Sequence, residues 1–292
     1  MATDTDQAWR DRGQLLDVDG DAVFVRDEPT IDPDPALPPL LVLHGFPTCS
    51  YDFAAVLPSL AARRRVVLPD HLGHGLSAKP DRRYGIRMLA DAVEGVVAAL
   101  AIPQVDLLTH DVGDSVGGEL LARDLDGQLG FAVRRRVLTN GSIYMDLAQL
   151  SGGQELLLSL PDEPTDIVTE DAWIAGVRGT FAPSSHVPDD ELAALWRLNA
   201  HEDGHRMLPR TIRYIEDRRA EERRYTEAIE VHPSPLGIVW GELDPIAVHA
   251  MATRLATVRA DAPLVTLEDV GHYPMLEAPD RFARAVLELL DG

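Results

Sequence analysis

Short apolar runs alternate along the chain with longer amphipathic stretches. The runs predict strands, because they are nearly continuous and so resemble strands buried on both faces. They lie at Ala22–Arg26, Leu40–His44, Arg65–Leu68, Val105–Thr109, Arg136–Thr139, Leu236–Trp240 and Leu264–Leu267. The amphipathic stretches have the apolar spacing of helices, and the main ones are Ile86–Leu100, Ser115–Asp124 and Arg281–Leu290. Repeated alternation of strand and helix is typical of an α/β protein with a mostly parallel, doubly wound sheet.

The alternation stops between Tyr144 and His232. That part predicts helices only, at Leu147–Leu158, Asp171–Val177, Asp189–Asn199 and Thr211–Ile229. Helices inserted between two strands of a parallel sheet can cover its carboxyl edge, where ligands bind in open α/β sheets. We therefore expect an all-helical cap at residues 144–232, inserted between two parts of one core at residues 1–143 and 233–292.

Composition narrows the class of protein. The hydrophobic content of 45% and charged content of 26% are ordinary for a globular protein. The formal net charge of −21 disfavours binding to nucleic acid or to an anionic membrane surface, because both would repel the chain. Cys49 is the only cysteine, which excludes an intrachain disulfide. The N-terminus MATDTDQAWRDRG lacks the apolar region of a secretory signal, so we expect a cytoplasmic protein.

The segment VDLLTHDVGDSVGGELLARD (105–124) offers two candidate nucleophiles. Ser115 lies in Gly113-Asp114-Ser115-Val116-Gly117, which matches the G-x-S-x-G pattern of a nucleophile elbow. Asp111 lies in Thr109-His110-Asp111-Val112-Gly113, directly after the strand. An elbow residue must leave the strand at once, so that its side chain stands at the carboxyl end of the strand. Asp111 does so, whereas Ser115 would lie about one turn into the helix, and the geometry favours Asp111.

A base and an acid follow later in the chain. His272, in LEDVGHYPMLEAPDRF (267–282), comes after the last predicted strand and before the C-terminal helix. This is the position of the base in enzymes whose chain order is nucleophile, acid and histidine. Asp244, in LGIVWGELDPIAVHA (236–250), follows another buried strand and could orient the imidazole. Asp146, in NGSIYMD (140–146), is the alternative acid.

The motifs HGFPT, HDVG, WGELDP and GHYPMLEAP occur in this order, with a helical segment before WGELDP. Together they resemble the epoxide hydrolase and haloalkane dehalogenase branch of the α/β-hydrolases. The stretches HDVGDSVGGELLARD, LTNGSIY, GELDP and HYPMLE are more similar still to the mesoderm-specific transcript protein group within that branch. The resemblance covers residues 20–290 and implies an α/β-hydrolase fold.

A carboxylate nucleophile implies a particular reaction. It attacks an sp3 carbon that bears a leaving group, and the product is an alkyl ester of Asp111. His272 would then deprotonate a water, which hydrolyses this ester while Asp244 holds the imidazole. The backbone N–H groups of Phe46 and Val112 would form the oxyanion hole. Water is the co-substrate, and we expect neither a metal ion nor an organic cofactor.

The leaving group distinguishes two kinds of enzyme. A halide needs N–H donors, which haloalkane dehalogenases generally place at the positions occupied here by Val112 and Phe46. Neither of these residues has a side-chain N–H, although Trp173 or Trp196 in the cap could substitute.

An epoxide opens to an alkoxide and needs an acid, which epoxide hydrolases take from cap tyrosines. Tyr214 is the first candidate for this acid, Tyr144 the second and Tyr225 the third. We therefore expect epoxide hydrolysis of a small apolar organic substrate to a diol. The alternatives are a dehalogenase-like enzyme with a different halide site, an esterase using Ser115, and a protein that keeps the fold but only binds a ligand or partner.

Overall fold

Eight strands form one sheet in the computed structural model, which describes residues 5–30 and 32–292. The first four residues of the polar N-terminal stretch lie outside the described part. The strands are β1 Gln14–Val18, β2 Asp21–Glu28, β3 Leu40–Leu43, β4 Val66–Pro69, β5 Gln104–His110, β6 Ala132–Thr139, β7 Leu236–Gly241 and β8 Leu264–Leu267. Their order is β1-β2-β4-β3-β5-β6-β7-β8. β1 and β2 pair antiparallel, β2 pairs antiparallel with β4, and all later pairs are parallel.

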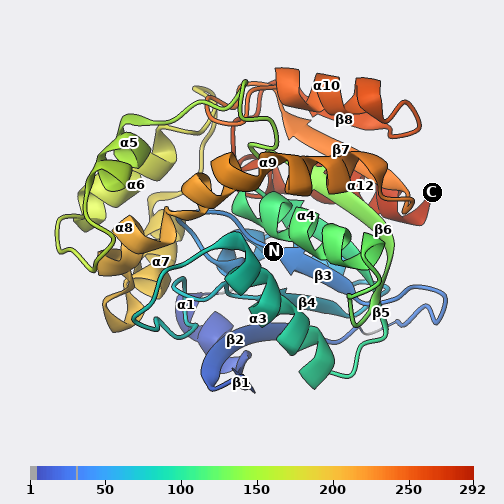
Figure 1. Ribbon diagram of the computed structural model, residues 1–292, viewed down its shortest axis with the longest axis horizontal. Coiled ribbons are helices and arrows are strands. Elements are labelled where there is room, and N and C mark those ends of the chain that lie inside the picture. Colours follow the sequence, from blue (N-terminus) through green and yellow to red (C-terminus); the bar gives the residue numbers. More distant parts are fainter. Residues whose placement is uncertain (1–4, 31) are drawn as a thin grey trace.

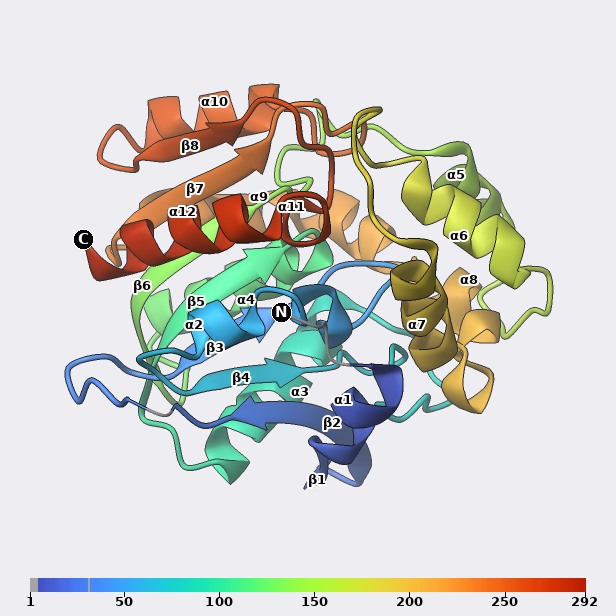
Figure 2. The ribbon, with the colours of Figure 1, turned by 180° about the vertical axis from the view of Figure 1, so that it is seen from behind.

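The middle of the sheet is covered on both faces. Helices α3 (Ile86–Ala99) and α4 (Val112–Leu125) lie on one face (Figure 1), and α2 (Leu57–Leu60) and α12 (Pro279–Asp291) lie on the other (Figure 2). Every residue of β3, β4 and β7 is therefore buried. This double coverage explains why these strands read as unbroken apolar runs.

The seven strands expected from the sequence are all present, and the doubly wound α/β fold is confirmed. β1 was not predicted. It is an edge strand paired only with β2, and Leu15 within it is 61% exposed. Only Val18 of this strand is buried, and Leu16 is partly buried, so its sequence lacks the continuous apolar run that marks a strand buried on both faces.

Between β6 and β7 the described chain forms only helices: α5 Gly152–Ser159, α6 Glu170–Arg178, α7 Asp189–Asn199, η2 His201–Met207, α8 Leu208–Thr211 and α9 Tyr214–Val231. Helix α5 begins five residues later than expected at Leu147. Ser151 and Gln154 form a capping box at its start, each side chain accepting from the other's backbone N–H, and this arrangement fixes the first turn.

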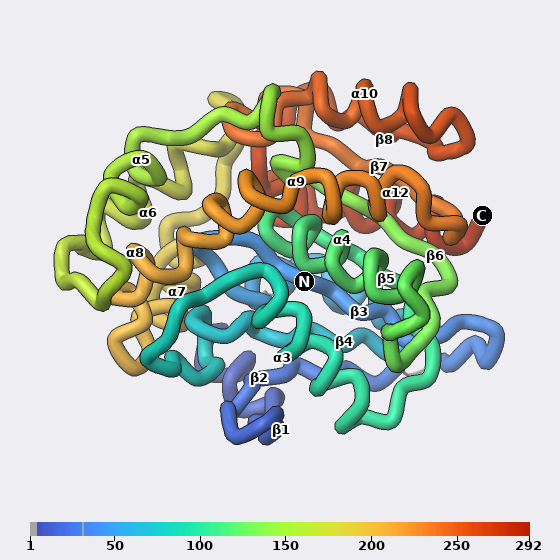
Figure 3. The backbone as a smooth tube through the Cα atoms, in the orientation of Figure 1, coloured from blue at the N-terminus to red at the C-terminus, as the bar shows by residue number. Residues whose placement is uncertain are grey.

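The helices of this segment lie in two places. The chain leaves β6, forms α5 to α8 beyond the carboxyl ends of the parallel strands, and returns along α9 beside α4 (Figure 3). A Cβ atom on Gly118 of α4 would lie 3.0 Å from the carbonyl oxygen of Tyr225 in α9, so these two helices are in close contact. The first turn of α9 is thereby held near the carboxyl end of β5.

The remaining helices are short or peripheral: α1 Asp6–Asp11, η1 Ser50–Phe53, α10 Ala250–Val258 and α11 Pro274–Glu277. Within residues 5–30 and 32–292, no helix is both long enough and apolar enough to cross a membrane.

Candidate active site

Asp111 alone makes the turn between β5 and α4. The strand ends at His110, one residue later than expected, and the helix begins at Val112. The Asp111 backbone has φ 51° and ψ −113°, a conformation that non-glycine residues rarely adopt and that is associated with functional turns. The side chain is 2% exposed. The structure thus has the sharp strand-to-helix turn of a nucleophile elbow at Asp111.

Two glycines allow neighbouring segments to approach this turn closely. A Cβ atom on Gly113 would lie 2.4 Å from the carbonyl oxygen of Leu43, at the end of β3. A Cβ atom on Gly45 would lie 2.7 Å from Nδ1 of His110 and 2.8 Å from Cβ of Asp111. Real Cβ atoms do not approach so closely, so both positions require glycine. The loop after β3 can therefore touch the elbow.

The loop after β3 supplies a hydrogen bond to Asp111. The backbone N–H of Phe46 donates to Asp111 Oδ2 at 2.8 Å, and the Tyr273 hydroxyl donates to the Phe46 carbonyl oxygen at 3.1 Å. Val112 is the first residue of α4, where the backbone N–H has no acceptor within the helix. Phe46 and Val112 are the two donors expected from the sequence, and both lie beside Asp111.

His272 joins the other two residues of the expected triad. Its Nδ1 is 2.7 Å from Asp244 Oδ2, and its Nε2 is 4.0 Å from Asp111 Oδ1. The latter distance is too long for a hydrogen bond. Burial opposes a charge on the imidazole, but the Asp244 carboxylate and then Asp111 outweigh it, and together they raise the pKa of His272 to about 9.

Asp244 is held by several donors at once. Its Oδ1 accepts from the backbone N–H of Ile246 at 2.7 Å and of Ala247 at 3.0 Å. Its Oδ2 accepts from Asn140 Nδ2 at 2.7 Å as well as from His272. A carboxylate is the one side chain of this size that accepts at both ends, so the surroundings are built for an ionised acid.

Asp146, the alternative acid, is not in the site. Its side chain is 65% exposed and pairs with Arg254 Nη1 at 2.8 and 2.9 Å. The loop after β6 turns outward before it reaches residue 146, so proximity in sequence to a strand end does not bring this carboxylate to His272.

Ser115, the alternative nucleophile, forms a hydrogen bond with Arg218. It lies in the first turn of α4, is 3% exposed, and its hydroxyl oxygen accepts from Arg218 Nε at 2.8 Å. Among the described residues, no histidine forms a hydrogen bond with it. The hydroxyl therefore lacks the base that activates a serine nucleophile.

Tyr214 lies beside the nucleophile. Its ring is 1% exposed and packs against Phe46, with ring centroids 5.8 Å apart. Burial, and then the charge of Asp111, raise the pKa of Tyr214, while the charge of Arg218 opposes this shift. The phenol is therefore protonated over the ordinary pH range and can act as a donor.

Tyr144 and Tyr225 make their contacts elsewhere, and neither is among the residues that line the cavity beside His272. The Tyr144 hydroxyl donates to Glu230 Oε1 at 2.8 Å, and the Arg254 guanidinium stacks on its ring at 4.0 Å. Its hydroxyl and its ring are therefore both engaged by residues outside the group around Asp111. Tyr225 packs in the contact between α9 and α4.

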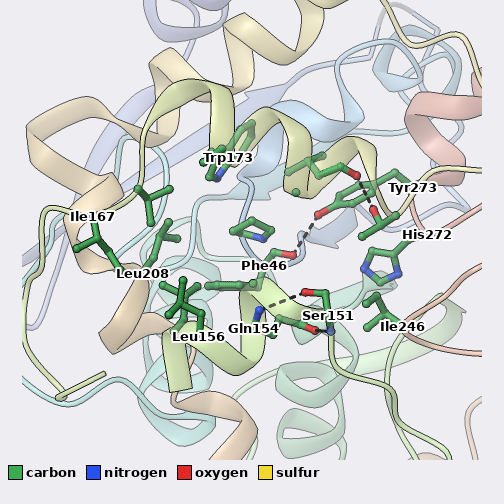
Figure 4. Close-up of a pocket in the computed structure, with 18 residues that line it drawn as sticks. Phe46, Ser151, Gln154, Leu156, Ile167, Trp173, Leu208, Ile246, His272 and Tyr273 are labelled. Atoms are coloured by element: carbon green, nitrogen blue, oxygen red, sulfur yellow. Dashed lines mark hydrogen bonds between the residues drawn. The ribbon is translucent and has the colours of Figure 1, made fainter. Parts of the chain in front are cut away.

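A mostly apolar cavity of about 190 Å³ opens beside His272. In Figure 4, His272, Tyr273 and Ile246 lie at one end of it and Ile167 and Leu208 at the other. Helices α5 and α6 supply much of the wall, including Leu157, Trp173 and Val177. Trp173 Nε1 is buried and has no hydrogen-bond partner within the described residues. Trp196 stacks behind Trp173, with centroids 5.8 Å apart, and does not line the cavity.

The sequence analysis missed three residues that support the site. Tyr273 holds the Phe46 carbonyl, Asn140 holds Asp244, and His110 Nε2 contacts the His272 carbonyl oxygen at 2.8 Å. Burial lowers the pKa of His110 to about 3, so this imidazole is neutral and its Nε2–H donates. Each of the three is next to a strand end or to a residue that was identified, and that adjacency was the available signal.

The chain belongs to the alpha/beta hydrolase family, whose model matches residues 40–285. The LipZ protein of Mycobacterium tuberculosis is 39% identical over 292 residues, covering 99% of both chains. The mesoderm-specific transcript protein of Mus musculus is 29% identical over 295 residues, covering 98% of this chain and 88% of that protein. The crystal structure of Cfl2 from Burkholderia cenocepacia has a TM-score of 0.77 at 21% identity and 95% coverage of each chain. The resemblance inferred from the motifs is confirmed, and the chain is an α/β-fold hydrolase.

Proposed function

We propose that this hydrolase attacks its substrate with the Asp111 carboxylate and that the substrate is an epoxide, which is hydrolysed to a diol. The observation that carries the proposal is the hydrogen bond of 2.8 Å from the Phe46 N–H to Asp111 Oδ2. It holds one carboxylate oxygen in the oxyanion hole and leaves Oδ1 directed toward His272 at 4.0 Å. We further propose that residues 144–232 act as the cap over this site.

In the first step, Asp111 Oδ1 bonds to an epoxide carbon and the carbon–oxygen bond of the ring breaks. The ring oxygen takes the proton of the Tyr214 hydroxyl, so the product is an alkyl ester of Asp111 bearing a neighbouring hydroxyl. Tyr214 suits this role because it lies close to Asp111 and burial keeps it protonated. Proton donation of this kind contributes roughly 10²–10⁴ in rate.

In the second step, His272 Nε2 takes a proton from water, and the hydroxide bonds to the Asp111 carbonyl carbon. The negative charge develops on Oδ2, where the N–H groups of Phe46 and Val112 stabilise it. The ester bond breaks, and the diol oxygen takes the proton from the imidazolium. The proton left on the Asp111 carboxyl passes to the Tyr214 phenolate and restores the phenol. The overall reaction is therefore epoxide plus water to diol.

The cavity favours an apolar substrate. Its wall is mostly aliphatic and aromatic, and its volume of about 190 Å³ is below the roughly 300–1,000 Å³ usual for drug-sized ligands. Leu156 and Ile167 on its rim are 54% and 45% exposed. A small or narrow organic epoxide therefore fits, and a longer tail would lie over these two side chains.

The proposal is tested by trapping the ester. His272→Ala should form the adduct and fail to hydrolyse it, so its intact mass should rise by the mass of one epoxide when it is incubated with an epoxide library. Peptide mapping should place the addition on Asp111. His272→Ala/Asp111→Asn should show no addition, whereas His272→Ala/Ser115→Ala should still show it. An adduct on Ser115, or an acyl adduct from an ester panel with none from epoxides, contradicts the proposal.

Dehalogenation is a second candidate because Trp173 offers an indole N–H without a partner on the wall of the cavity. An N–H in such a dry place could hold a departing halide. Halide release from a haloalkane panel that is lost in Trp173→Phe would favour this reaction over epoxide opening.

A further inference from the structure

A second, smaller cavity lies next to the candidate active site. It has a volume of about 40 Å³, and its wall includes Tyr214 and Arg218 from the first turns of α9. Ile246 and Gln154 line both this cavity and the larger apolar one. The two cavities are therefore neighbours, and a molecule reacting at Asp111 could reach into both.

Arg218 is a buried cation with few partners. Arg218 is only 4% exposed. Its Nη2 atom is buried and has no hydrogen-bond partner within residues 5–30 and 32–292. Its remaining interactions are with neutral groups: Nε donates to the Ser115 hydroxyl at 2.8 Å, and Cζ lies 4.9 Å from the centre of the Tyr214 ring. Within those same residues, no carboxylate forms an ion pair with it.

Asp114 does not neutralise this charge. The charge of Arg218 lowers the pKa of Asp114, but burial has the larger effect and raises this pKa well above its ordinary value. The Thr109 hydroxyl bonds one of its oxygens, and the other has no partner in the described structure. Among the described residues Asp114 forms no ion pair with the guanidinium, and burying a cation without an ion-pair partner is strongly unfavourable.

We propose that the smaller cavity binds a carboxylate group of the substrate, with the Arg218 guanidinium as its partner. A guanidinium matches the planar carboxylate in geometry and charge. The volume of about 40 Å³ compares with roughly 10–15 Å³ for one water, which suits a group of three non-hydrogen atoms. The inference rests on the proposed function and specifies its substrate: an acid whose reactive carbon lies near the carboxylate and whose apolar part enters the larger cavity.

The site can be tested with unreactive probes. We expect wild-type protein to bind octanoate at least tenfold more tightly than 1-octanol in isothermal titration calorimetry at pH 8, since a charge-assisted hydrogen bond is stronger than one between neutral groups. Arg218→Met should lose this preference while keeping its affinity for 1-octanol. The matched control is Arg223→Met, because Arg223 lies on the same helix, is 91% exposed and forms an ion pair with Glu227.

Circular dichroism must show that the variants are folded. If Arg218→Met is not, the wild-type comparison decides alone: equal affinity for octanoate and 1-octanol overturns the carboxylate site. A preference that survives in folded Arg218→Met also overturns it.

Turnover separates this inference from the proposed reaction. An epoxide bearing a carboxylate should react with a kcat/KM at least tenfold above that of its methyl ester in wild-type protein, and equally with it in Arg218→Met. Octanoate selectivity without turnover of any epoxide would contradict the epoxide chemistry and not the carboxylate site. Turnover with no preference for the acid would contradict the site and not the chemistry.

Discussion

Replacing Asp244 by asparagine tests the arrangement around the proposed base. Four donors converge on this carboxylate, from Ile246, Ala247, Asn140 and His272. An asparagine has nearly the same shape, but one end of its amide is an NH₂ group. In either orientation that NH₂ group meets donors, so the side chain must either leave donors unpaired or release the imidazole.

The effect on His272 can be estimated from its pKa. A shift from 6.5 to about 9 corresponds to roughly 3 kcal/mol in favour of the imidazolium, and Asp244 is the main cause that raises the value. Without the carboxylate, the pKa of His272 should fall and the imidazole should lose its fixed tautomer. Because the equivalent change in a serine protease lowers kcat by about 10⁴, we expect ester hydrolysis in Asp244→Asn to slow by about 10²–10⁴.

The assay follows the two steps separately. Rapid-quench intact mass measurements on a reactive epoxide should show that the Asp111 ester forms at a nearly unchanged rate in Asp244→Asn and then accumulates. Nuclear magnetic resonance titration should find a lower pKa for His272 than in wild type. Asp146→Asn is the control, since Asp146 is exposed and paired with Arg254, and it should behave as wild type. Unchanged ester hydrolysis in Asp244→Asn, or its loss in Asp146→Asn, would refute this assignment of the acid.

Three further predictions follow from the same geometry. Tyr214→Phe should slow ester formation on epoxides by about 10²–10⁴, because it removes the proposed acid, and single-turnover mass measurements should show no accumulated adduct; normal ester formation would exclude Tyr214. Gly113→Ala should lower the free energy of unfolding by about 1–3 kcal/mol, measured by urea denaturation, because its Cβ would meet the Leu43 carbonyl; Gly176→Ala, which meets nothing within 4 Å, is the control and should show no such loss. The raised pKa of His272 should stabilise the fold fully below pH 6.5 and lose that contribution as pH rises to about 9, by about 3 kcal/mol; a pH dependence of unfolding that is the same in His272→Gln would contradict this.

The grouping of Asp111, Asp244 and His272 could be predicted from sequence because each lies at or soon after the carboxyl end of a strand. Asp111 follows β5, and Asp244 and His272 lie in the loops after β7 and β8. The carboxyl ends of parallel strands share one edge of the sheet, so residues far apart in sequence arrive at the same place. Strands β3, β4 and β7 were identifiable because all of their residues are buried, which gives continuous apolar runs.

The contacts that sequence analysis did not predict depend on the path of a loop or on the direction of a side chain. Tyr144 and Asp146 follow β6, yet both meet Arg254, and Tyr144 also meets Glu230 from α9. Arg218 reaches Ser115 across 103 positions in sequence. Such contacts are decided by packing between segments, which hydrophobic periodicity does not encode.

The two candidate nucleophiles differ in what the surrounding donors require of them. A carboxylate has two oxygens, so Asp111 can place Oδ2 against the Phe46 N–H and still attack with Oδ1. A serine hydroxyl has one oxygen, which attacks the substrate, while the oxyanion hole holds an oxygen of the substrate. An oxyanion donor that already bonds the side chain at the elbow is therefore expected for an acid and not for an alcohol. Ser115 matches the G-x-S-x-G pattern but lies four residues after Asp111, within the first turn of α4. Its hydroxyl oxygen accepts from Arg218. The position relative to β5 thus predicts which side chain lies at the strand-to-helix turn better than the spacing of the glycines does.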